Sequence, residues 1–416
     1  MSGFRTKRLI VFLLKLNTKS MRLPLLLILF PLLALAADAY IYGRNLRHKS
    51  RWVKVLWWAV TVLVLVAVLL AVLFQIKFKG RLDINVAMWT FYAFFLVYMP
   101  KWFYSICSLF DYLPRLWHKR RGRWGHFVGL VLSFYVMASM LYGAFYARQH
   151  PVYNYRTVTF DRLPEAFDGY RIVQFSDLHI ETLGSAGRYL PRWVADIDSL
   201  HPDLIVFTGD LVNRQGGELT RYMQELSRLS ATDGVYSVLG NHDYGDYYHW
   251  TSPAEQKKTL QQLIADEGRM GWHMLNNRSV WLHRGNDSIA LIGVENWGMP
   301  PFPQYGRLAE AYPALNDSTF KILLSHNPLH WRHEVIPQSN IDLTLSGHTH
   351  AMQLKLGWKG FEYSLAEPMY PEWSGLYIAP DGRQKLYVNE GMGCVGLPMR
   401  IGARPEITII TLKKEP

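Results

Sequence analysis

Residues 346–352 read S-G-H-T-H-A-M and place His348 and His350 two positions apart, directly after the apolar run at residues 341–345. Side chains at positions i and i+2 of an extended backbone project to the same side, so both imidazoles can reach one pocket. Such a pair is typical of a metal site, but histidine pairs also occur as solvated loop residues. The surrounding sequence must decide between these two interpretations.

Four further apolar runs end in the same way, each delivering polar residues at its carboxyl end. The runs at residues 172–175, 204–207, 235–239 and 322–324 lead to Asp177 and His179, to Asp210, to Asn241, His242 and Asp243, and to His326. In an open α/β sheet, ligands bind outside the carboxyl ends of the strands. Five strands would therefore bring these side chains to one rim.

Five ordered motifs resemble the signature of the calcineurin-like metallophosphoesterases. They are D-L-H (177–179), G-D (209–210), G-N-H-D (240–243), S-H-N-P (325–328) and G-H-T-H (347–350). The resemblance covers roughly residues 155–412. The bacterial membrane-associated branch, which includes hydrolases of UDP-diacylglucosamine, is the most similar. The resemblance implies an α/β fold, a four-layer α-β-β-α sandwich.

The patterning of this part of the chain agrees with an α/β unit, because apolar strands alternate with helical segments. We expect a strand at residues 157–160, helices at 188–200, 218–229 and 253–267, and antiparallel strands at 376–378, 386–389 and 406–412.

The resemblance also implies a dinuclear metal site. Asp177, His179, Asp210 and His350 would hold the first ion, and Asp210, Asn241, His326 and His348 would hold the second, with Asp210 bridging. Because several ligands are nitrogen atoms, the set suits Mn, Fe or Zn better than Ca or Mg alone. A hydroxide shared by two such cations would attack a phosphate in line.

His242 would assist catalysis without being a ligand. In the family, the corresponding histidine stabilises the transition state or protonates the departing oxygen, and the resemblance gives Asp243 the role of orienting it. Asp243 can equally be a turn or helix N-cap residue. Gln353 and Arg400 are candidates for substrate binding, although Arg400 could instead pair on the surface. Residues 351–352 are Ala-Met where many relatives have two glycines, which argues against a close approach of this backbone to substrate.

The formal net charge of +12 is unevenly distributed. Residues 1–150 hold 21 Lys and Arg but three Asp and Glu, whereas the remainder holds 24 and 30. The basic charge therefore does not describe a nucleic-acid-binding face on the catalytic part, and no nucleic-acid partner is expected. Cys107 and Cys394 suggest no disulfide framework.

Apolar runs near residues 23–41, 55–76, 84–110 and 125–147 predict four transmembrane helices, because about 20 apolar residues cross a bilayer. Lys101 interrupts the third run. The simpler interpretation, which we prefer, ends the span near Pro100 and places Lys101 at the headgroups. The alternative is that Lys101 snorkels or faces the bundle interior.

We therefore predict a transmembrane region at residues 1–150 and a metallophosphoesterase domain at residues 151–416. Basic residues gather in the loops 43–54 and 111–124, which the positive-inside rule places in the cytoplasm, with the catalytic domain outside. The basic tail, residues 1–22, conflicts with this topology. A start at Met21 would remove the conflict, whereas cleavage after A-L-A at residues 34–36 would leave three spans and a cytoplasmic domain.

The predicted function is that of a membrane-anchored metal-dependent phosphoesterase acting on a phosphodiester or pyrophosphate. A lipid-linked substrate ranks first, since aromatic residues including Trp297, Phe302, Tyr370 and Trp373 could admit a lipid headgroup, and a soluble nucleotide or phosphoprotein ranks second. The bilayer and a phosphate-containing substrate are the expected partners. The alternative class is a receptor or scaffold that kept the fold without catalysis. Retention of every ligand and of His242 favours the enzyme.

Overall fold

The computed structural model describes residues 19–77, 83–117, 120–358 and 360–415. The chain divides into two compact units, one of residues Met1–Leu73 and Thr90–Ala138 and one of residues Phe74–Trp89 and Ser139–Pro416. The choice between a start at Met1 and a start at Met21 concerns a tail whose first 18 residues lie outside the described residues.

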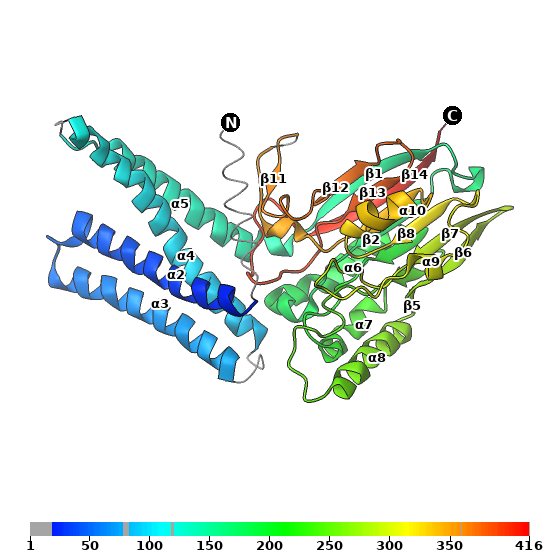
Figure 1. Ribbon diagram of the computed structural model, residues 1–416, viewed down its shortest axis with the longest axis horizontal. Helices are drawn as coiled ribbons and strands as arrows, with labels where there is room; N and C mark the ends of the chain where they lie inside the picture. The colour runs from blue at the N-terminus through cyan, green and yellow to red at the C-terminus, as the bar shows by residue number, and fades with distance from the viewer. Residues whose placement is uncertain (1–18, 78–82, 118–119, 359, 416) are drawn as a thin grey trace. The chain divides into compact units, whose positions relative to one another are not determined.

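Long helices dominate the first part of the chain (Figure 1). The long helices are α2 (Lys19–Ile41), α3 (Arg51–Lys77), α4 (Ile84–Leu109) and α5 (Trp124–Phe145), and the short segments η1 (Tyr42–Leu46) and η2 (Phe110–Trp117) follow α2 and α4. Among the described residues, three segments are long and apolar enough to cross a membrane, at Arg51–Lys77, Ile84–Leu116 and Trp124–Gln149. Each overlaps a predicted span. The span predicted at residues 23–41 corresponds to α2, and its crossing of the membrane stays a prediction.

Lys101 lies inside the helix bundle rather than at the headgroups. Helix α4 continues past Pro100, and Lys101 Nζ lies 2.7 Å from Oδ1 of the fully buried Asp38. The other oxygen of Asp38 accepts hydrogen bonds from Thr61 and Tyr98 at 2.7 and 2.9 Å. The prediction that this span ends near Pro100 is therefore wrong, because a buried partner satisfies the charge within the bundle.

Two six-stranded mixed sheets form the centre of the second unit (Figure 1). In spatial order, the first sheet holds β1 (Val152–Phe160), β14 (Glu406–Lys414), β2 (Arg171–Phe175), β3 (Leu204–Phe207), β4 (Val235–Ser237) and β5 (Trp272–Met274). The second holds β12 (Gly375–Ile378), β13 (Lys385–Val388), β9 (Leu343–Ser346), β8 (Lys321–Leu324), β7 (Asp287–Gly293) and β6 (Arg278–Arg284). A separate hairpin pairs β10 (Lys355–Leu356) with β11 (Tyr363–Ser364).

Helical segments connect the strands of this unit. They are η3 (Ala147–Gln149), η4 (Glu165–Phe167), η5 (Ile180–Tyr189), α6 (Leu190–Ser199), η6 (Gly216–Arg221), α7 (Met223–Leu226), α8 (Pro253–Arg269), α9 (Leu308–Ala311), η7 (Trp331–Val335), α10 (Ile336–Gln338) and η8 (His350–Gln353). The predicted helices at 188–200 and 253–267 correspond to α6 and α8. The predicted helix at 218–229 is instead a 3-10 segment followed by the short α7.

Alternating residues on the buried strands separate the layers, because successive side chains of a strand point to opposite faces. On β2, Ile172 joins the core between the sheets, whereas Val173 packs with residues of α6 and α8. On β8, Ile322 joins the same inner core and Leu323 packs with α9 and η7. The two outer helical layers enclose two sheets, which confirms the predicted α-β-β-α sandwich.

The expectation of antiparallel strands after residue 350 is only partly correct. Strand β13 pairs antiparallel with β12 but parallel with β9, and β14 pairs antiparallel with β2 but parallel with β1. Strands β13 and β14 each lie beside a partner that is distant in sequence. The local sequence pattern does not predict whether such strand pairs run parallel or antiparallel. The antiparallel hairpin of β6 and β7 was not anticipated.

A buried carboxyl group on α8 generates a prediction about stability. Glu267 is 1% exposed and accepts a hydrogen bond from Ser237 Oγ at 2.6 Å. Burial raises the pKa of Glu267 to about 8, from 4.5 in an exposed carboxyl group. The folded state therefore binds the extra proton, and the free energy of unfolding falls by up to about 1.4 kcal/mol per pH unit as the pH rises from about 5 to 8.

We expect Glu267→Gln to remove this loss. Thermal unfolding of the detergent-solubilised protein, followed by tryptophan fluorescence, should show a variant that gains stability relative to the unmodified chain as the pH rises. Glu310→Gln, at an exposed carboxyl group on α9, is the control. Parallel stability curves for the Glu267 variant and the unmodified chain would contradict the prediction.

Candidate metal centre

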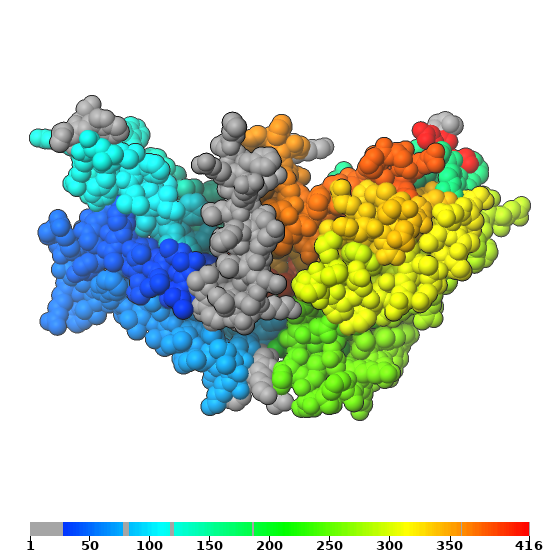
Figure 2. Space-filling model, in the orientation of Figure 1, coloured from blue at the N-terminus to red at the C-terminus, as the bar shows by residue number. Residues whose placement is uncertain are grey.

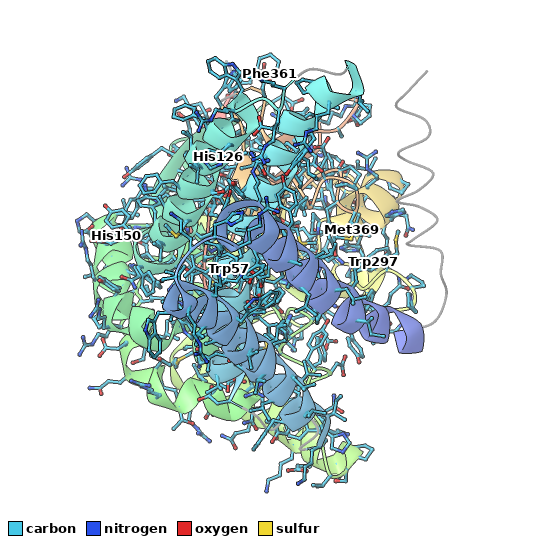
Figure 3. All side chains as sticks on the ribbon, turned by 90° about the vertical axis from the view of Figure 1, so that its left-hand side faces the viewer. Trp57, His126, His150, Trp297, Phe361 and Met369 are labelled. Atoms are coloured by element: carbon cyan, nitrogen blue, oxygen red, sulfur yellow. The ribbon has the colours of Figure 1, made fainter. Side chains whose placement is uncertain are left out.

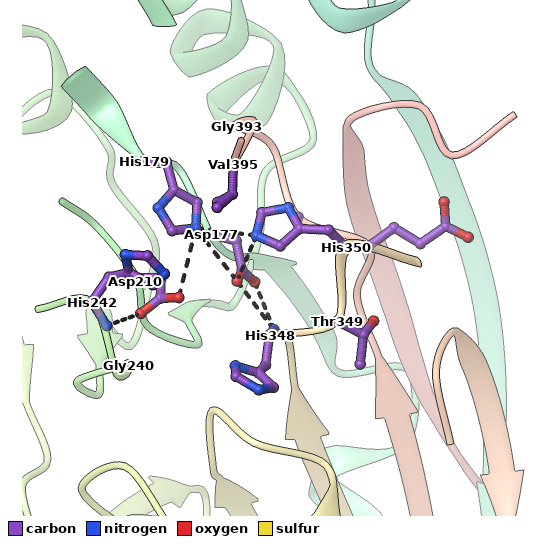
Figure 4. Close-up of polar contacts among 12 residues, drawn as sticks. Asp177, His179, Asp210, Gly240, His242, His348, Thr349, His350, Gly393 and Val395 are labelled. Carbon is purple, nitrogen blue, oxygen red and sulfur yellow. Dashed lines mark hydrogen bonds and ion pairs between the residues drawn. The ribbon is translucent and has the colours of Figure 1, made fainter. Parts of the chain in front are cut away.

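Polar side chains from five strand ends meet where the carboxyl ends of the two sheets come together (Figure 4). The first sheet supplies Asp177 and His179 after β2, Asp210 after β3 and Asn241 after β4, and the second supplies His326 after β8 and His348 and His350 after β9. The rim expected from the sequence is thus a junction between two sheets. It is not one edge of a single sheet.

The first group of facing atoms surrounds Asp177. His350 Nε2 lies 3.2 Å from Asp177 Oδ1 and 3.1 Å from His179 Nε2. His179 Nε2 also lies 3.6 Å from Asp210 Oδ2. All four side chains are buried. These are the four residues predicted to hold the first ion.

The second group shares Asp210 with the first. His326 Nε2 lies 3.2 Å from Asp210 Oδ2, 3.2 Å from Asn241 Oδ1 and 3.1 Å from His348 Nδ1. Asp210 Oδ2 therefore faces histidines of both groups, as a bridging ligand must. The structure brings all seven predicted ligands together.

The chemistry of this cluster fits divalent cations. Within each of three sets, one ligand atom per residue lies within 4.8 Å of the others, in Asp177, His179 and His350, in Asp210, His326 and His348, and in His179, Asp210 and His242. Pairs of imidazole nitrogens face one another at 3.1 Å in a buried setting, where only one nitrogen of a pair can carry a proton. A cation placed among such lone pairs would satisfy them together.

Protonation states support the same conclusion, because ligation requires neutral imidazoles and ionised carboxylates. Burial lowers the pKa of His348 to about 3 and also lowers the pKa of His179 and His350. Burial opposes ionisation of Asp210, but the surrounding histidines hold its pKa well below the usual range. Burial likewise opposes protonation of His326, yet the Asp210 carboxylate raises its pKa to about 9. A cation would displace that proton.

Neighbouring groups orient the imidazole rings. His326 Nδ1 lies 2.7 Å from the carbonyl oxygen of Thr208, which fixes Nδ1 as the donor and leaves Nε2 to face the cluster. His348 Nε2 lies 2.8 Å from the hydroxyl group of Tyr370. Partners of this kind commonly hold metal-binding histidines in place.

Arg400 is a positioning residue rather than a surface or substrate-binding residue. Its guanidinium is fully buried and donates to His350 Nδ1 at 2.9 Å and to the carbonyl oxygens of Glu390, Gly393 and Ala403 at 2.8 to 3.1 Å. These bonds hold the ring of His350. No local sequence signal connects positions 350 and 400, so the contact could not have been predicted.

The side chain of Gln353 also forms hydrogen bonds within the protein. Its side-chain amide donates to the carbonyl oxygens of Leu397 and Met399 at 2.8 and 3.0 Å, and its oxygen accepts from Val395 N at 2.5 Å. The polar atoms of the Gln353 side chain are thus bonded to backbone, and a role in substrate binding stays a prediction.

The carboxylate of Asp243 accepts hydrogen bonds from the backbone of neighbouring loops, whereas the His242 ring bonds to Asn213. Its Oδ2 accepts from the N–H groups of Asp210 and Gly240 at 2.9 and 2.8 Å, and its Oδ1 accepts from Val212 N at 3.1 Å. These bonds tie together the loops that carry Asp210 and Asn241. The structure therefore supports the turn role, and corrects the expectation that Asp243 orients His242.

His242 lies beside the cluster and is oriented by the main chain. Its Nδ1 lies 2.8 Å from the carbonyl oxygen of Asn213, and its backbone N–H donates to Asp210 Oδ1 at 2.8 Å. Its ring contacts His179 edge-on at 4.7 Å between centroids and stacks on Tyr247 at 4.3 Å. With Nδ1 donating to the carbonyl oxygen, Nε2 is the atom left to interact with a substrate.

The ligands stand on strained backbone, as is common at functional sites. Left-handed φ angles occur at Asp177, His179, Asp210, His348, His350, Ala351, Met352 and Gln353. Glycine is required at two positions where the backbone approaches a candidate metal-binding carboxylate. A Cβ at Gly240 would collide with Asp210, and a Cβ at Gly347 would collide with Asp177. Residues 351–352 have left-handed angles although neither is glycine, so this turn carries strain that glycine would relieve.

Comparison with known proteins agrees with this geometry. Two family profiles match, one described as the transmembrane domain of a probable calcineurin-like phosphoesterase over residues 21–148 and one as calcineurin-like phosphoesterase over residues 170–352. The chain is 33% identical to a zebrafish (Danio rerio) transmembrane protein with metallophosphoesterase domain, over 70% of this chain and 64% of that protein. The chain thus spans under two thirds of the length of that relative.

This chain aligns with a larger share of the length of two bacterial relatives. An uncharacterized metallophosphoesterase of Bacillus subtilis, YkuE, is 32% identical over 62% of this chain and 84% of its own length. The UDP-2,3-diacylglucosamine pyrophosphatase LpxG of Chlamydia muridarum is 28% identical over 61% of this chain and 88% of its own length. The chain therefore belongs to the calcineurin-like metallophosphoesterases, a family of metal-dependent phosphoric ester hydrolases.

Because Asp210 faces both groups of ligands, its loss should disrupt metal binding more than the loss of any residue in one group. We expect Asp210→Ala to reduce the bound metal to background, measured by inductively coupled plasma mass spectrometry after purification with Mn²⁺ or Zn²⁺. His283→Ala, at an exposed histidine on β6, should retain the metal content of the unmodified chain. Undiminished metal in a folded Asp210 variant would contradict the bridging role.

Proposed function

We propose that this protein is a membrane-anchored phosphoesterase that hydrolyses a phosphodiester or pyrophosphate at the junction of the two sheets. The observation that carries the proposal is that seven candidate ligand side chains form one cluster around Asp177 and Asp210, with His242 beside them. A receptor or scaffold would not need His242 in that place.

The ligands divide into two groups. Asp177, His179, Asp210 and His350 would hold one divalent cation, and Asp210, Asn241, His326 and His348 would hold a second. When bound, two such cations would polarise the phosphoryl group and acidify water. The choice among Mn, Fe and Zn follows from the mixed nitrogen and oxygen ligands and is open to measurement.

The chain itself supplies orientation and a proton. The Nδ1–H of His242 donates to the Asn213 carbonyl oxygen, which leaves Nε2 to face the substrate. In the imidazolium form Nε2 also carries a proton, and its transfer to a phosphoryl oxygen or to the departing group would leave a neutral ring with Nδ1–H still bonded to Asn213. Asp243 keeps the two ligand loops in register through backbone N–H groups. The loss of His242 should therefore slow the chemical step while leaving the ligands in place.

Release of p-nitrophenol from bis-p-nitrophenyl phosphate tests this proposal. The full chain in detergent should show turnover that depends on Mn²⁺, and Asp210→Ala should show none. His242→Ala should lower kcat by about a hundredfold to ten thousandfold and keep its metal. His249→Ala, at an exposed histidine, should leave kcat unchanged. If the unmodified chain has no metal-dependent turnover, the enzyme assignment fails.

An exposed apolar hairpin beside the metal centre supports a lipid-linked substrate. The hairpin of β10 and β11 begins two residues after η8, which carries His350. In its loop, Trp358 is 73% exposed and Phe361 is 75% exposed. Phe361 is labelled in Figure 3, and the segment reaches the molecular surface in orange in Figure 2. Large exposed apolar groups mark contacts with lipid or protein. Met369 is also exposed, and the next residue, Tyr370, bonds His348.

A substrate with acyl chains should depend on this hairpin, whereas a small ester should not. We expect the double substitution Trp358→Ser and Phe361→Ser to lower kcat/KM for UDP-2,3-diacylglucosamine by about tenfold or more, since each large apolar side chain contributes about 1.5–3 kcal/mol when buried. Turnover of bis-p-nitrophenyl phosphate should stay unchanged. Trp281→Ser, at a half-exposed tryptophan on β6, is the control.

If the double substitution lowers the turnover of both substrates equally, the hairpin instead has a structural role. Mass spectrometry of a total lipid extract, before and after incubation with the protein, would identify lipid species that are consumed.

We retain three sequence-based predictions as part of this proposal. They are a transmembrane region at residues 1–150 with a catalytic domain at residues 151–416, four spans near residues 23–41, 55–76, 84–110 and 125–147, and an extracytoplasmic catalytic domain. Labelling of single introduced cysteines on either side of intact cells would test the topology.

A further inference from the structure

A basic cavity lies in the first unit, and none of the residues that line it is a candidate for metal binding or catalysis. It has a volume of about 420 Å³. Its lining residues come from the two loops predicted to be cytoplasmic and from the first turn of α5, and they are Arg44, Asn45, Arg121, Gly122, Arg123 and His126. Figure 3 shows His126 on α5. All six residues belong to the same compact unit.

The single acidic residue of these two loops, Asp111, is fully engaged. Its Oδ2 lies 2.5 Å from Arg44 and accepts from His126 N at 2.9 Å, while its Oδ1 accepts from Gly125 N at 2.8 Å. The Asp111 carbonyl oxygen accepts from Gly122 N at 2.9 Å. The single negative charge of Asp111 is therefore balanced by Arg44, which leaves the charges of the other arginines without a matching carboxylate in these two loops.

Positive charge remains at the cavity without a matching anion. The residues from 111 to 124 hold one acidic residue and several basic ones. Arg121 and Arg123 line the cavity, and neither pairs with a carboxylate in the described part of the chain. Three guanidinium groups gather around one ring, since Arg44, Arg115 and Arg121 lie 5.5, 5.0 and 4.9 Å from the centroid of Tyr112. Gathering like charges costs free energy that a bound anion would offset.

Arg44 adds a donor that is already fixed in place. Its side chain is 1% exposed, and its terminal nitrogens donate to Asp111, to Tyr40 and to the carbonyl oxygen of Ser108. Its Nε is buried and has no hydrogen-bond partner in the described part of the chain. Asn45 and His126 are held through the hydroxyl group of Tyr104, at 2.6 and 2.8 Å. The cavity is thus a built polar site rather than a gap between mobile side chains.

The position of the cavity along the chain places it at the level of lipid headgroups. Arg44 precedes the candidate span that begins at Arg51, and Arg121 and Arg123 lie between the span that ends at Leu116 and the one that begins at Trp124. Basic pockets at the ends of membrane helices bind phosphorylated headgroups, and the guanidinium fork matches phosphate oxygens.

We propose that this cavity binds a phosphate group, as carried by an anionic phospholipid or by a soluble phosphate. Arg121 and Arg123 supply the exposed charge, and Arg44 supplies a buried and oriented guanidinium. The site is separate from the metal centre and does not depend on the proposed hydrolysis.

Native mass spectrometry of the full chain in detergent tests the proposal, with phosphatidylglycerol, phosphatidylcholine and inorganic phosphate as separate probes. The double variant R121Q/R123Q removes two charges from the cavity. The double variant R47Q/K49Q removes two exposed charges from the neighbouring predicted cytoplasmic loop and leaves the cavity lining intact. Thermal unfolding of each variant establishes that it is folded.

We expect phosphatidylglycerol to be retained over phosphatidylcholine, with retention falling at least about tenfold in R121Q/R123Q and remaining unchanged in R47Q/K49Q. Binding of inorganic phosphate alone, with the same dependence on the two arginines, would support the site with a soluble ligand. Equal losses in the two double variants would show diffuse attraction to the basic loops and overturn the proposal. Absence of binding by every probe would overturn it as well.

Discussion

The structure depends on burying two carboxylates, Asp177 and Asp210, among imidazoles where water cannot stabilise them. A buried carboxylate is costly unless positive charge or donors surround it. Here the compensation comes from both sheets at once, since β2 and β3 deliver the carboxylates while β8 and β9 deliver His326, His348 and His350. The packing of the two sheets therefore closes this cluster, and the candidate metal site follows from that arrangement.

The cluster is held by groups that never reach a substrate. Asp243 links the loops after β3 and β4 through backbone N–H groups, and Arg400 reaches across from the last part of the chain to hold His350. Left-handed backbone at most of the ligands is the cost of presenting them toward one point. The surrounding sandwich, with three buried apolar clusters around its sheets, supplies the stability that offsets this strain.

The membrane part follows the same rule with different residues. Only three acidic residues occur among the first 150. Two of them are buried in the helical unit, and each lies against one basic side chain. Asp38 pairs with Lys101 inside the bundle, and Asp111 pairs with Arg44 at its end. In both cases, backbone or hydroxyl donors complete the coordination of the carboxylate. Charge in an apolar setting is thus matched in both pairs, and Arg121 and Arg123 line the cavity beside the second pair.

The sequence by itself determined an α/β pattern and the order of the candidate ligands, because each candidate ligand follows an apolar strand and this pattern is local. The layered arrangement was predicted from the resemblance to the metallophosphoesterases. The sequence also determined the apolar helices. The tertiary structure decided the grouping of ligand atoms around Asp210, the role of Asp243, and the burial of Arg400 and Lys101. It could do so because these outcomes depend on how two sheets and several helices pack. A contact between positions 350 and 400, or 38 and 101, depends on the folded path of the chain, which no local pattern of residues encodes.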